Sequence, residues 1–422
     1  MNLRWLALLF VATGAHAADP AQAYPTDLPP LDQALTAIRQ APAVRATKVL
    51  IDAESANRDR LEAGPHEWAI RLESQVRNIV TPESRRYNEW RGALERPLRL
   101  PGKAAIDAEI GAQGIARAEA AYGDALHETA RSLLKRWFAW LREREAARQW
   151  QRQSDSLLKQ QQATARRIQL GDASRLELMQ AEAATAQAQA ALEQAKLKEI
   201  VAATELGASF PAIRRPEALT ITAPQPLAGS FSEWREHLLE HNHELMLARS
   251  ESLRGRLLAN RADAERLPDP TVGVHFGADR SGEERLVGIS LSIPIPGGAR
   301  AANVRREAAM AEASSQWEAA TLVKIDAEIA STFATAQAAF IAWQRADEAA
   351  QRMAQAAALM ERARALGEAG LAEQLLALRQ ANEATLLATT ARLDALEANY
   401  RLYVDAHELW RYSDEAETPR MK

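Results

Sequence analysis

The chain has 422 residues, of which 47% are hydrophobic and 26% are charged, and its formal net charge is −4. Alanine and leucine supply most of the hydrophobic fraction, which favours helices over strands. So balanced a charge, without a long basic block, argues against a nucleic-acid partner. The sequence contains no cysteine, so we expect neither disulfides nor a lipid anchor on an N-terminal cysteine.

Residues 1–17 have the pattern of a secretory signal peptide. Arg4 precedes an apolar run over residues 5–12, and Ala15-His16-Ala17 forms an A-x-A cleavage site. The competing interpretation is a short buried N-terminal helix. No later apolar stretch reaches the roughly 20 residues that a transmembrane helix needs. An exported chain of this kind is expected in the periplasm, outside the cell, or in the outer membrane as a β-barrel.

Two long stretches without proline predict two very long helices, because proline ends helices. The proline-free stretches lie between Pro101 and Pro211 and between Pro296 and Pro419. We predict helices over residues about 102–167 and 299–365. The first would be about 100 Å long at about 1.5 Å per residue. Such a helix must pack along other long helices, in a coiled coil or a helical tube.

Each predicted long helix is preceded by two segments in which apolar and polar residues alternate. These segments cover residues about 66–79, 87–100, 270–278 and 285–296. Alternation of this kind indicates strands with one apolar face. Segments of about ten residues match transmembrane strands, although an amphipathic hairpin that covers a soluble core would show the same alternation. Four strands cannot close a barrel, so a membrane-spanning sheet would require several chains.

The chain resembles itself at an offset of about 195 residues. Pro101-Gly102, at the start of the first long helix, corresponds to Pro296-Gly297, and Leu170–Ala173 corresponds to Leu366–Ala369. Two landmarks at nearly one offset predict an internal duplication. We assign the first helix–hairpin–helix repeat to residues 31–210 and the second to residues 231–412. The remaining segments are linkers over 18–30 and 211–230 and a C-terminal tail over 413–422.

Each predicted long helix ends at a glycine that is followed by another helix. A glycine just after a helix end adopts the left-handed conformation cheaply, and a capping residue can then start the next helix. We therefore predict tight turns, here called tips, at residues 168–175 and 366–371, far from the strands. Their central residues are Leu170, Gly171, Asp172, Ala173 and Ser174 in the first repeat and Leu366, Gly367, Glu368, Ala369 and Gly370 in the second.

The duplicated strand–turn–helix junctions and the two tip motifs, in this order and spacing, resemble the TolC family of outer-membrane efflux proteins. The resemblance covers about residues 31–412. It implies a mainly helical fold in which a homotrimer builds a periplasmic α-barrel and one shared twelve-stranded β-barrel in outer-membrane lipid. It places the chain in the outer membrane of a Gram-negative bacterium, with the tips meeting a periplasmic adaptor protein that an inner-membrane pump carries.

Within that family, the spacing of Glu95-Arg96-Pro97 and Pro101-Gly102-Lys103 is most similar to the CzcC-like heavy-metal efflux branch. That likeness implies an RND-type pump and heavy-metal cations as cargo. The alternatives are the outer-membrane component of drug efflux or of type I protein secretion. A periplasmic coiled-coil adaptor or scaffold, a different class, would also use long helices, but it would carry one helical hairpin where this chain predicts two.

The sequence shows no motif for catalysis or for cofactor binding, so we expect neither an enzyme nor a cofactor. His237 and His241 are four residues apart, which suits two metal ligands on one helix face, but a solvated helix start is the favoured explanation. Charges beside the tips would form either a closable aperture or ordinary solvated helix ends. These charged residues are Arg166, Arg167, Glu177, Arg362, Arg364 and Glu373.

Overall fold

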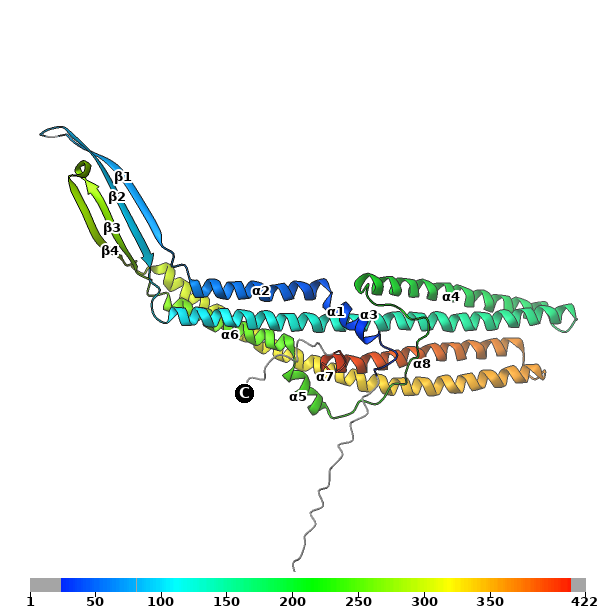
Figure 1. Cartoon of the computed structure of the whole chain (residues 1–422). Coiled ribbons are helices and arrows are strands. Elements are labelled where there is room, and N and C mark those ends of the chain that lie inside the picture. The colour runs from blue at the N-terminus through cyan, green and yellow to red at the C-terminus, as the bar shows by residue number, and fades with distance from the viewer. Residues whose placement is uncertain (1–23, 81, 411–422) are drawn as a thin grey trace, which may run out of the picture.

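The computed structural model describes residues 24–80 and 82–410. The predicted signal peptide (1–17) and C-terminal tail (413–422) lie outside the described residues. The described chain is an elongated bundle of helices with a four-stranded sheet projecting from one end (Figure 1). None of the described helices combines the length and the apolar character needed to cross a membrane.

The two halves of the described chain have the same order of elements: two helices, a hairpin, a very long helix and a further helix. The first half contains α1 (Leu31–Arg39), α2 (Pro42–Ala63), β1 (Ala69–Ile79), β2 (Arg85–Pro97), α3 (Lys103–Gln169) and α4 (Arg175–Ser209). The second half contains α5 (Phe231–Glu240), α6 (His243–Ala264), β3 (Thr271–Asp279), β4 (Glu284–Ser292), α7 (Gly298–Ala365) and α8 (Leu371–Asp405). The proline-free helices α3 and α7 have 67 and 68 residues.

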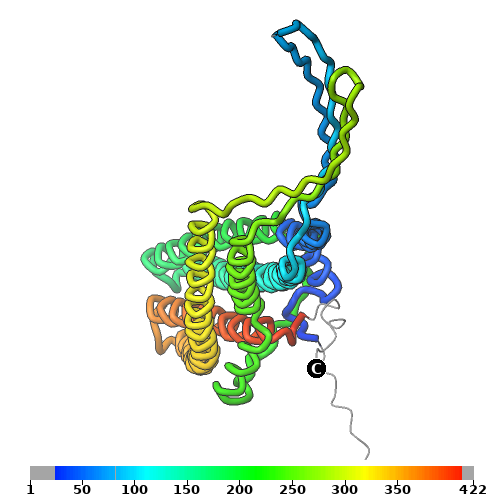
Figure 2. Tube along the Cα trace, turned by 90° about the vertical axis from the view of Figure 1, so that its left-hand side faces the viewer, coloured from blue at the N-terminus to red at the C-terminus, as the bar shows by residue number. Residues whose placement is uncertain are grey.

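Two shorter helices pack against each long helix, one after the other along its length. α2 and α4 pack against α3, and α6 and α8 pack against α7. Because α6 and α8 also contact α3, they lie between the two long helices (Figure 2). The helices thus form a layer, ordered α2, α3, α6, α7 near the sheet and α4, α3, α8, α7 farther from it. The place where the start of α6 meets the end of α8, beside α5, is called the joint below.

The core lies midway along the bundle, where α3 faces α1 and α8. Trp137, Phe138 and Leu141 of α3 are fully buried, together with Leu393 of α8. The Trp137 indole N–H donates to the Asp27 carbonyl at 2.7 Å, which satisfies the ring's one polar group. Apolar residues at helical spacing therefore fix which side of α3 packs inward.

The sheet is antiparallel with the order β1-β2-β3-β4, so its central pair joins the two hairpins. The strand ends predicted at residues 100 and 296 are wrong, because β2 stops at Pro97 and β4 stops at Ser292. Proline cannot donate to a strand ladder, and Pro294 follows β4 closely. The first strand begins at Ala69 rather than at His66, because the His66 ring turns to Asp269, at 3.1 Å.

Candidate functional site

The register of the sheet sorts its side chains into an apolar and a polar face. Residues directly opposite one another share a face, so Ile70, Leu94, Val274 and Ile289 form one row across all four strands. Leu72, Phe276 and Val287 extend the same face. Val287 and Ile289 are 87% and 86% exposed. A continuous apolar face of this kind marks a surface that another molecule or a membrane covers.

The opposite face of the sheet carries charged residues that are held in pairs. The buried Glu89 carboxylate accepts from Gln75 Nε2 at 2.8 Å and lies 2.5 Å from Arg77 Nη2. Arg77 and Arg91 lie 3.6 and 3.5 Å from Asp279 Oδ2. A sheet with one apolar and one polar face is typical of membrane-spanning strands that have lipid on one side and water on the other.

The two outer strands leave the sheet open at both edges. β1 and β4 each pair with one neighbour among the described strands, and the sheet projects away from the helices (Figures 1 and 2). An edge strand presents a row of unpaired backbone N–H and C=O groups. Such groups cannot face hydrocarbon, so a sheet placed in lipid would need partner strands at both edges.

A buried ion pair fixes the sheet to the helices at the predicted strand-to-helix turn Pro101-Gly102. Lys103 Nζ donates to Asp269 Oδ1 at 2.8 Å and to the Leu267 carbonyl at 2.7 Å. Burial opposes ionisation of Asp269, but hydrogen bonds from Lys103, the Leu100 amide and His66 prevail and lower its pKa to about 2. The junction therefore holds a permanent carboxylate at neutral pH.

The two predicted turns at the helix starts differ in their backbone. Gly102 has φ +88°, a left-handed conformation that glycine adopts at low cost. Gly297, which follows Pro296, has φ −115°, which any residue adopts. The sequence likeness between the two junctions therefore does not extend to the glycine conformation.

Both predicted tips are tight turns at the end of the bundle farthest from the sheet (Figure 1). Gly171 and Gly367 share a φ of +78°. The Gly171 amide donates to the Ile168 carbonyl at 2.9 Å, and the Asp172 amide donates to the Arg167 carbonyl at 2.8 Å. The amides of residues 367 and 368 make the same pair of bonds. Each long helix thus ends in a Schellman motif with glycine at the left-handed position.

The helices after the tips start in two different ways. Ser174 Oγ accepts from the Glu177 amide at 3.2 Å and caps α4, as predicted. Gly370 has no side chain to do this, and its amide donates to Glu373 Oε2 at 2.9 Å. Leu170 and Leu366, at the turns themselves, are 82% and 74% exposed. The outer surface of each tip is therefore an exposed leucine beside charged residues.

The structure brings together some of the charges predicted to surround an aperture. Arg167 Nε lies 2.9 Å from Asp172 Oδ2 within the first tip. Arg364 of α7 lies near Glu177 and Arg167: burial lowers its pKa, the Glu177 charge raises it and the Arg167 charge lowers it. Glu373 caps α8, and Arg166 and Arg362 form no ion pair among the described residues. Whether these charges line an aperture stays a prediction.

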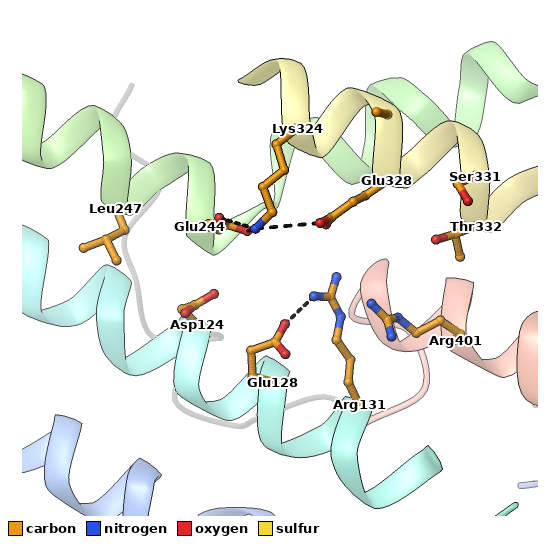
Figure 3. Close-up of a pocket in the computed structure, with 11 residues that line it drawn as sticks. Asp124, Glu128, Arg131, Glu244, Leu247, Lys324, Glu328, Ser331, Thr332 and Arg401 are labelled. Carbon is orange, nitrogen blue, oxygen red and sulfur yellow. Dashed lines mark hydrogen bonds and ion pairs between the residues drawn. The ribbon is translucent and has the colours of Figure 1, made fainter. Parts of the chain in front are cut away.

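An open, highly charged pocket lies between α3, α6, α7 and α8 (Figure 3). Lys324 Nζ lies 2.7 Å from Glu244 Oε1 and 3.7 Å from Glu328 Oε1, and Arg131 pairs with Glu128. The pair of Lys324 with Glu244 joins α7 to α6, whereas the other two pairs lie within α7 and within α3. The sequence did not identify this pocket, because its residues come from four helices that are distant in the chain.

The predicted histidine pair lies at the joint and belongs to a larger group. The His237 and His241 ring centroids are 4.8 Å apart. His243, His127 and His407 lie beside them, and the five are called the histidine cluster below. Sequence reasoning missed His127 and His407, since they come from α3 and from the end of α8. Among the described residues, no group of three or more histidine, cysteine or acidic side chains could hold a metal ion.

Comparison with known proteins identifies the fold. No family model matches the sequence, and no curated protein matches it either. Among solved structures, the CmeC outer membrane channel of Campylobacter jejuni superposes with a TM-score of 0.76 at 12% identity, over 91% of this chain and 87% of that one. The outer membrane protein VceC of Vibrio cholerae gives 0.72 at 15% identity, over 89% and 95%.

The MtrE outer membrane channel of Neisseria gonorrhoeae, in its open state, gives a TM-score of 0.65 at 17% identity, over 93% of this chain and 94% of that one. Such matches cover nearly the whole of both chains. The mainly helical fold class predicted from the sequence, with its β-hairpin portion, is confirmed. This chain therefore has the TolC-like fold of these outer-membrane channels.

Proposed function

We propose that this chain is one subunit of a passive export duct, which spans the outer membrane of a Gram-negative bacterium and extends into the periplasm. The main support for this proposal is the sheet, which has an exposed apolar face, an ion-paired polar face and two open edges. In a membrane, the apolar face would meet hydrocarbon and the polar face would meet a water-filled interior. Strands of 9 to 13 residues have the length that this role requires.

The open edges support a homotrimer. β4 of one chain would pair with β1 of the next, and three chains would close a twelve-stranded barrel without an unpaired edge. The helical layer is open in the same way near the sheet, where its outer helices are α2, which packs against α3, and α7, which packs against α6. Three such layers would close the periplasmic tube.

The tips support docking of a periplasmic adaptor. They lie at the far end of the bundle, where a duct would meet proteins of the inner membrane. The exposed leucines Leu170 and Leu366 offer apolar contacts, and Asp172, Glu368 and Arg167 offer polar ones. Small apolar anchors within a polar rim are typical of protein interfaces. The duct would be coupled through this adaptor to a pump, which supplies the energy.

We infer heavy-metal cations as cargo and an RND-type pump. The support is the resemblance of the junction motif Glu95-Arg96-Pro97 and Pro101-Gly102-Lys103 to the CzcC-like branch. The alternatives are drug efflux and type I protein secretion, which use ducts of the same kind. Deletion of the gene separates them: sensitivity to zinc, cobalt or copper supports metal export, whereas sensitivity to detergents alone supports drug export.

Fractionation and conductance test the duct itself. We expect the chain in the outer-membrane fraction, as a trimer that salt washing does not extract, and we expect the purified trimer to give steady conductance in planar lipid bilayers. A soluble periplasmic monomer that leaves bilayers silent would contradict the proposal and favour a scaffold.

A further inference from the structure

Another open pocket lies where linker residues 215–217 meet α3 and α4, and it is called the arginine pocket below. Its volume is about 610 Å³, within the roughly 300–1,000 Å³ that is typical of small-molecule sites. Two of its lining residues, Glu199 and Glu217, are acidic, and four are cationic. The cationic residues are Arg144 and Arg148 of α3, Lys196 of α4 and Arg215 of the linker. The lining therefore carries an excess of positive charge.

One arginine of this pocket is buried without an acidic partner. Arg144 is only 5% exposed, and its guanidinium lies over the Trp140 ring, with Cζ 5.2 Å from the ring centroid. Nη2 donates to the Glu217 carbonyl, whereas the buried Nη1 has no hydrogen-bond partner among the described residues. Arginine stays protonated in proteins. A buried positive charge with an unsatisfied donor is costly unless an anion compensates it.

The carboxylates around Arg144 do not supply that compensation. Glu145 is paired with Arg148, whose Nη1 donates to Glu145 Oε1 at 3.0 Å. Arg148 Nη2 donates to the Glu217 carbonyl at 2.9 Å, so a second guanidinium adds its charge beside the first. Burial and the Arg148 charge lower the pKa of Arg144, and the charges of Glu145 and Glu199 raise it by less. The site therefore lacks negative charge where Arg144 lies.

The architecture of the fold does not require a cation at this place, as the second half of the chain shows. At the offset that relates the two tips, Arg144 of α3 corresponds to Phe340 of α7, and Arg148 corresponds to Gln344. An apolar side chain thus occupies the equivalent position of the other long helix. Replacing a buried charge by an apolar group of similar volume is often neutral or stabilising. Helix packing therefore does not explain the buried guanidinium.

We propose that the arginine pocket binds a small polyvalent anion through carboxylate or phosphate oxygens, with Arg144 Nη1 as the central donor. A guanidinium is the donor that matches such oxygens best, and the Trp140 ring holds its plane in place. Lys196 and Arg215 add two further cations from the other two segments. Because Nη1 is covered, the anion reaches it by displacing exposed side chains of the rim, such as those of Arg215 and Glu217.

An anion bound here would also fasten the linker to the helices. The Glu217 carbonyl accepts from both Arg144 and Arg148 of α3, and Arg215 donates to the Ala203 carbonyl of α4. The proposed ligand lies among these three contacts and bridges the same segments. Because bound ligands stabilise the state that binds them, we expect backbone amides near residues 214–217 to exchange more slowly when the site is filled.

Calorimetry on the full chain, purified in detergent in a chloride buffer without phosphate or divalent metal ions, tests the proposal with pyrophosphate and citrate as probes. We expect one site per chain for at least one probe, with weaker binding as the salt concentration rises. Binding of pyrophosphate alone identifies the phosphate class, and binding of citrate alone identifies the carboxylate class. This inference stands apart from the proposed export function, because the protein could fail to conduct and still bind the anion.

Arg144→Met is the decisive variant, because it removes the guanidinium and leaves an apolar side chain of similar length. We expect it to weaken binding by about tenfold or more. Arg152→Met is the matched control: it removes the same charge from an exposed position of α3 and should change the affinity less than about twofold.

Lys196→Met, at the solvent-exposed rim, keeps the proposal testable if Arg144→Met does not fold, and it should also weaken binding. The proposal is overturned if the unaltered chain binds neither probe, or if Arg144→Met binds as tightly as Arg152→Met. Should Arg144→Met not fold, equal affinities of Lys196→Met and Arg152→Met overturn it.

Discussion

The tips allow a sharp test of the turn geometry, through one substitution made at two kinds of glycine. Gly171 has φ +78°, whereas Gly207 lies within the helix α4, and a Cβ at either position would meet nothing within 4 Å. The added methyl group therefore meets no neighbouring atom at either position, so the two substitutions differ only in the backbone conformation that alanine must adopt. Gly171→Ala should cost about 1–2 kcal/mol, because an L-residue is forced into the left-handed region. Gly207→Ala should instead stabilise its helix by about 0.5–1 kcal/mol.

Hydrogen exchange followed by mass spectrometry measures both effects locally. A loss of 1–2 kcal/mol corresponds to roughly 5- to 30-fold faster opening, so peptides that span residues 168–175 should exchange faster by about that factor in Gly171→Ala. Peptides around residue 207 should exchange more slowly in Gly207→Ala. Gly367→Ala should reproduce the first result at the second tip. If Gly171→Ala slows exchange as Gly207→Ala does, the Schellman interpretation of the tips is refuted.

Three further perturbations address the sheet, the junction and the core. Ile289→Arg, on the apolar face, should cost about 2–4 kcal/mol of membrane stability and deplete the outer-membrane fraction, whereas Ser290→Arg on the polar face should not; equal losses would contradict the assignment of faces. The pKa of Asp269 is lowered to about 2, so its contribution to stability is complete above about pH 4 and is lost as the pH falls towards 2. Thermal unfolding followed against pH should show this loss, and Asp269→Asn should remove that part of the pH dependence. Trp137→Ala, in the buried core, should cost about 3–5 kcal/mol, and an unchanged denaturation midpoint would argue against the core described here.

Much of the fold could be predicted from the sequence, because its signals are local. The long stretches without proline predicted α3 and α7, and the alternation of apolar and polar residues predicted the strands. Gly171 and Gly367 predicted the ends of the long helices. The strand ends were less accurate, since Asp269 holds the residues beside two of them through tertiary contacts: it contacts the His66 ring before β1 and accepts from the Leu100 amide after β2.

The histidine cluster and the charged pocket could not be predicted in the same way. His127 and His407 are 280 residues apart in the sequence, and only the packing of α3 against α8 brings them together. A signal for His407 was nevertheless present: a histidine stands at the end of a helix where the two tips have glycine. The left-handed backbone of Gly102 and the extended backbone of Gly297 could not be told apart from the sequence, because both glycines follow a proline at the start of a long helix.

Disulfide trapping between β1 and β4 tests most directly whether several chains share one barrel. The sequence contains no cysteine, so a pair can be introduced cleanly, with Leu72→Cys in β1 held fixed and cysteines scanned along β4 around Ile289. Within one chain the two edge strands are three strand spacings, about 14 Å, apart, beyond the roughly 7 Å that a disulfide spans. We predict cross-linked dimers and closed trimers at one register of the scan. Only monomers at every position, from a chain that is folded and membrane-bound, would contradict the shared barrel.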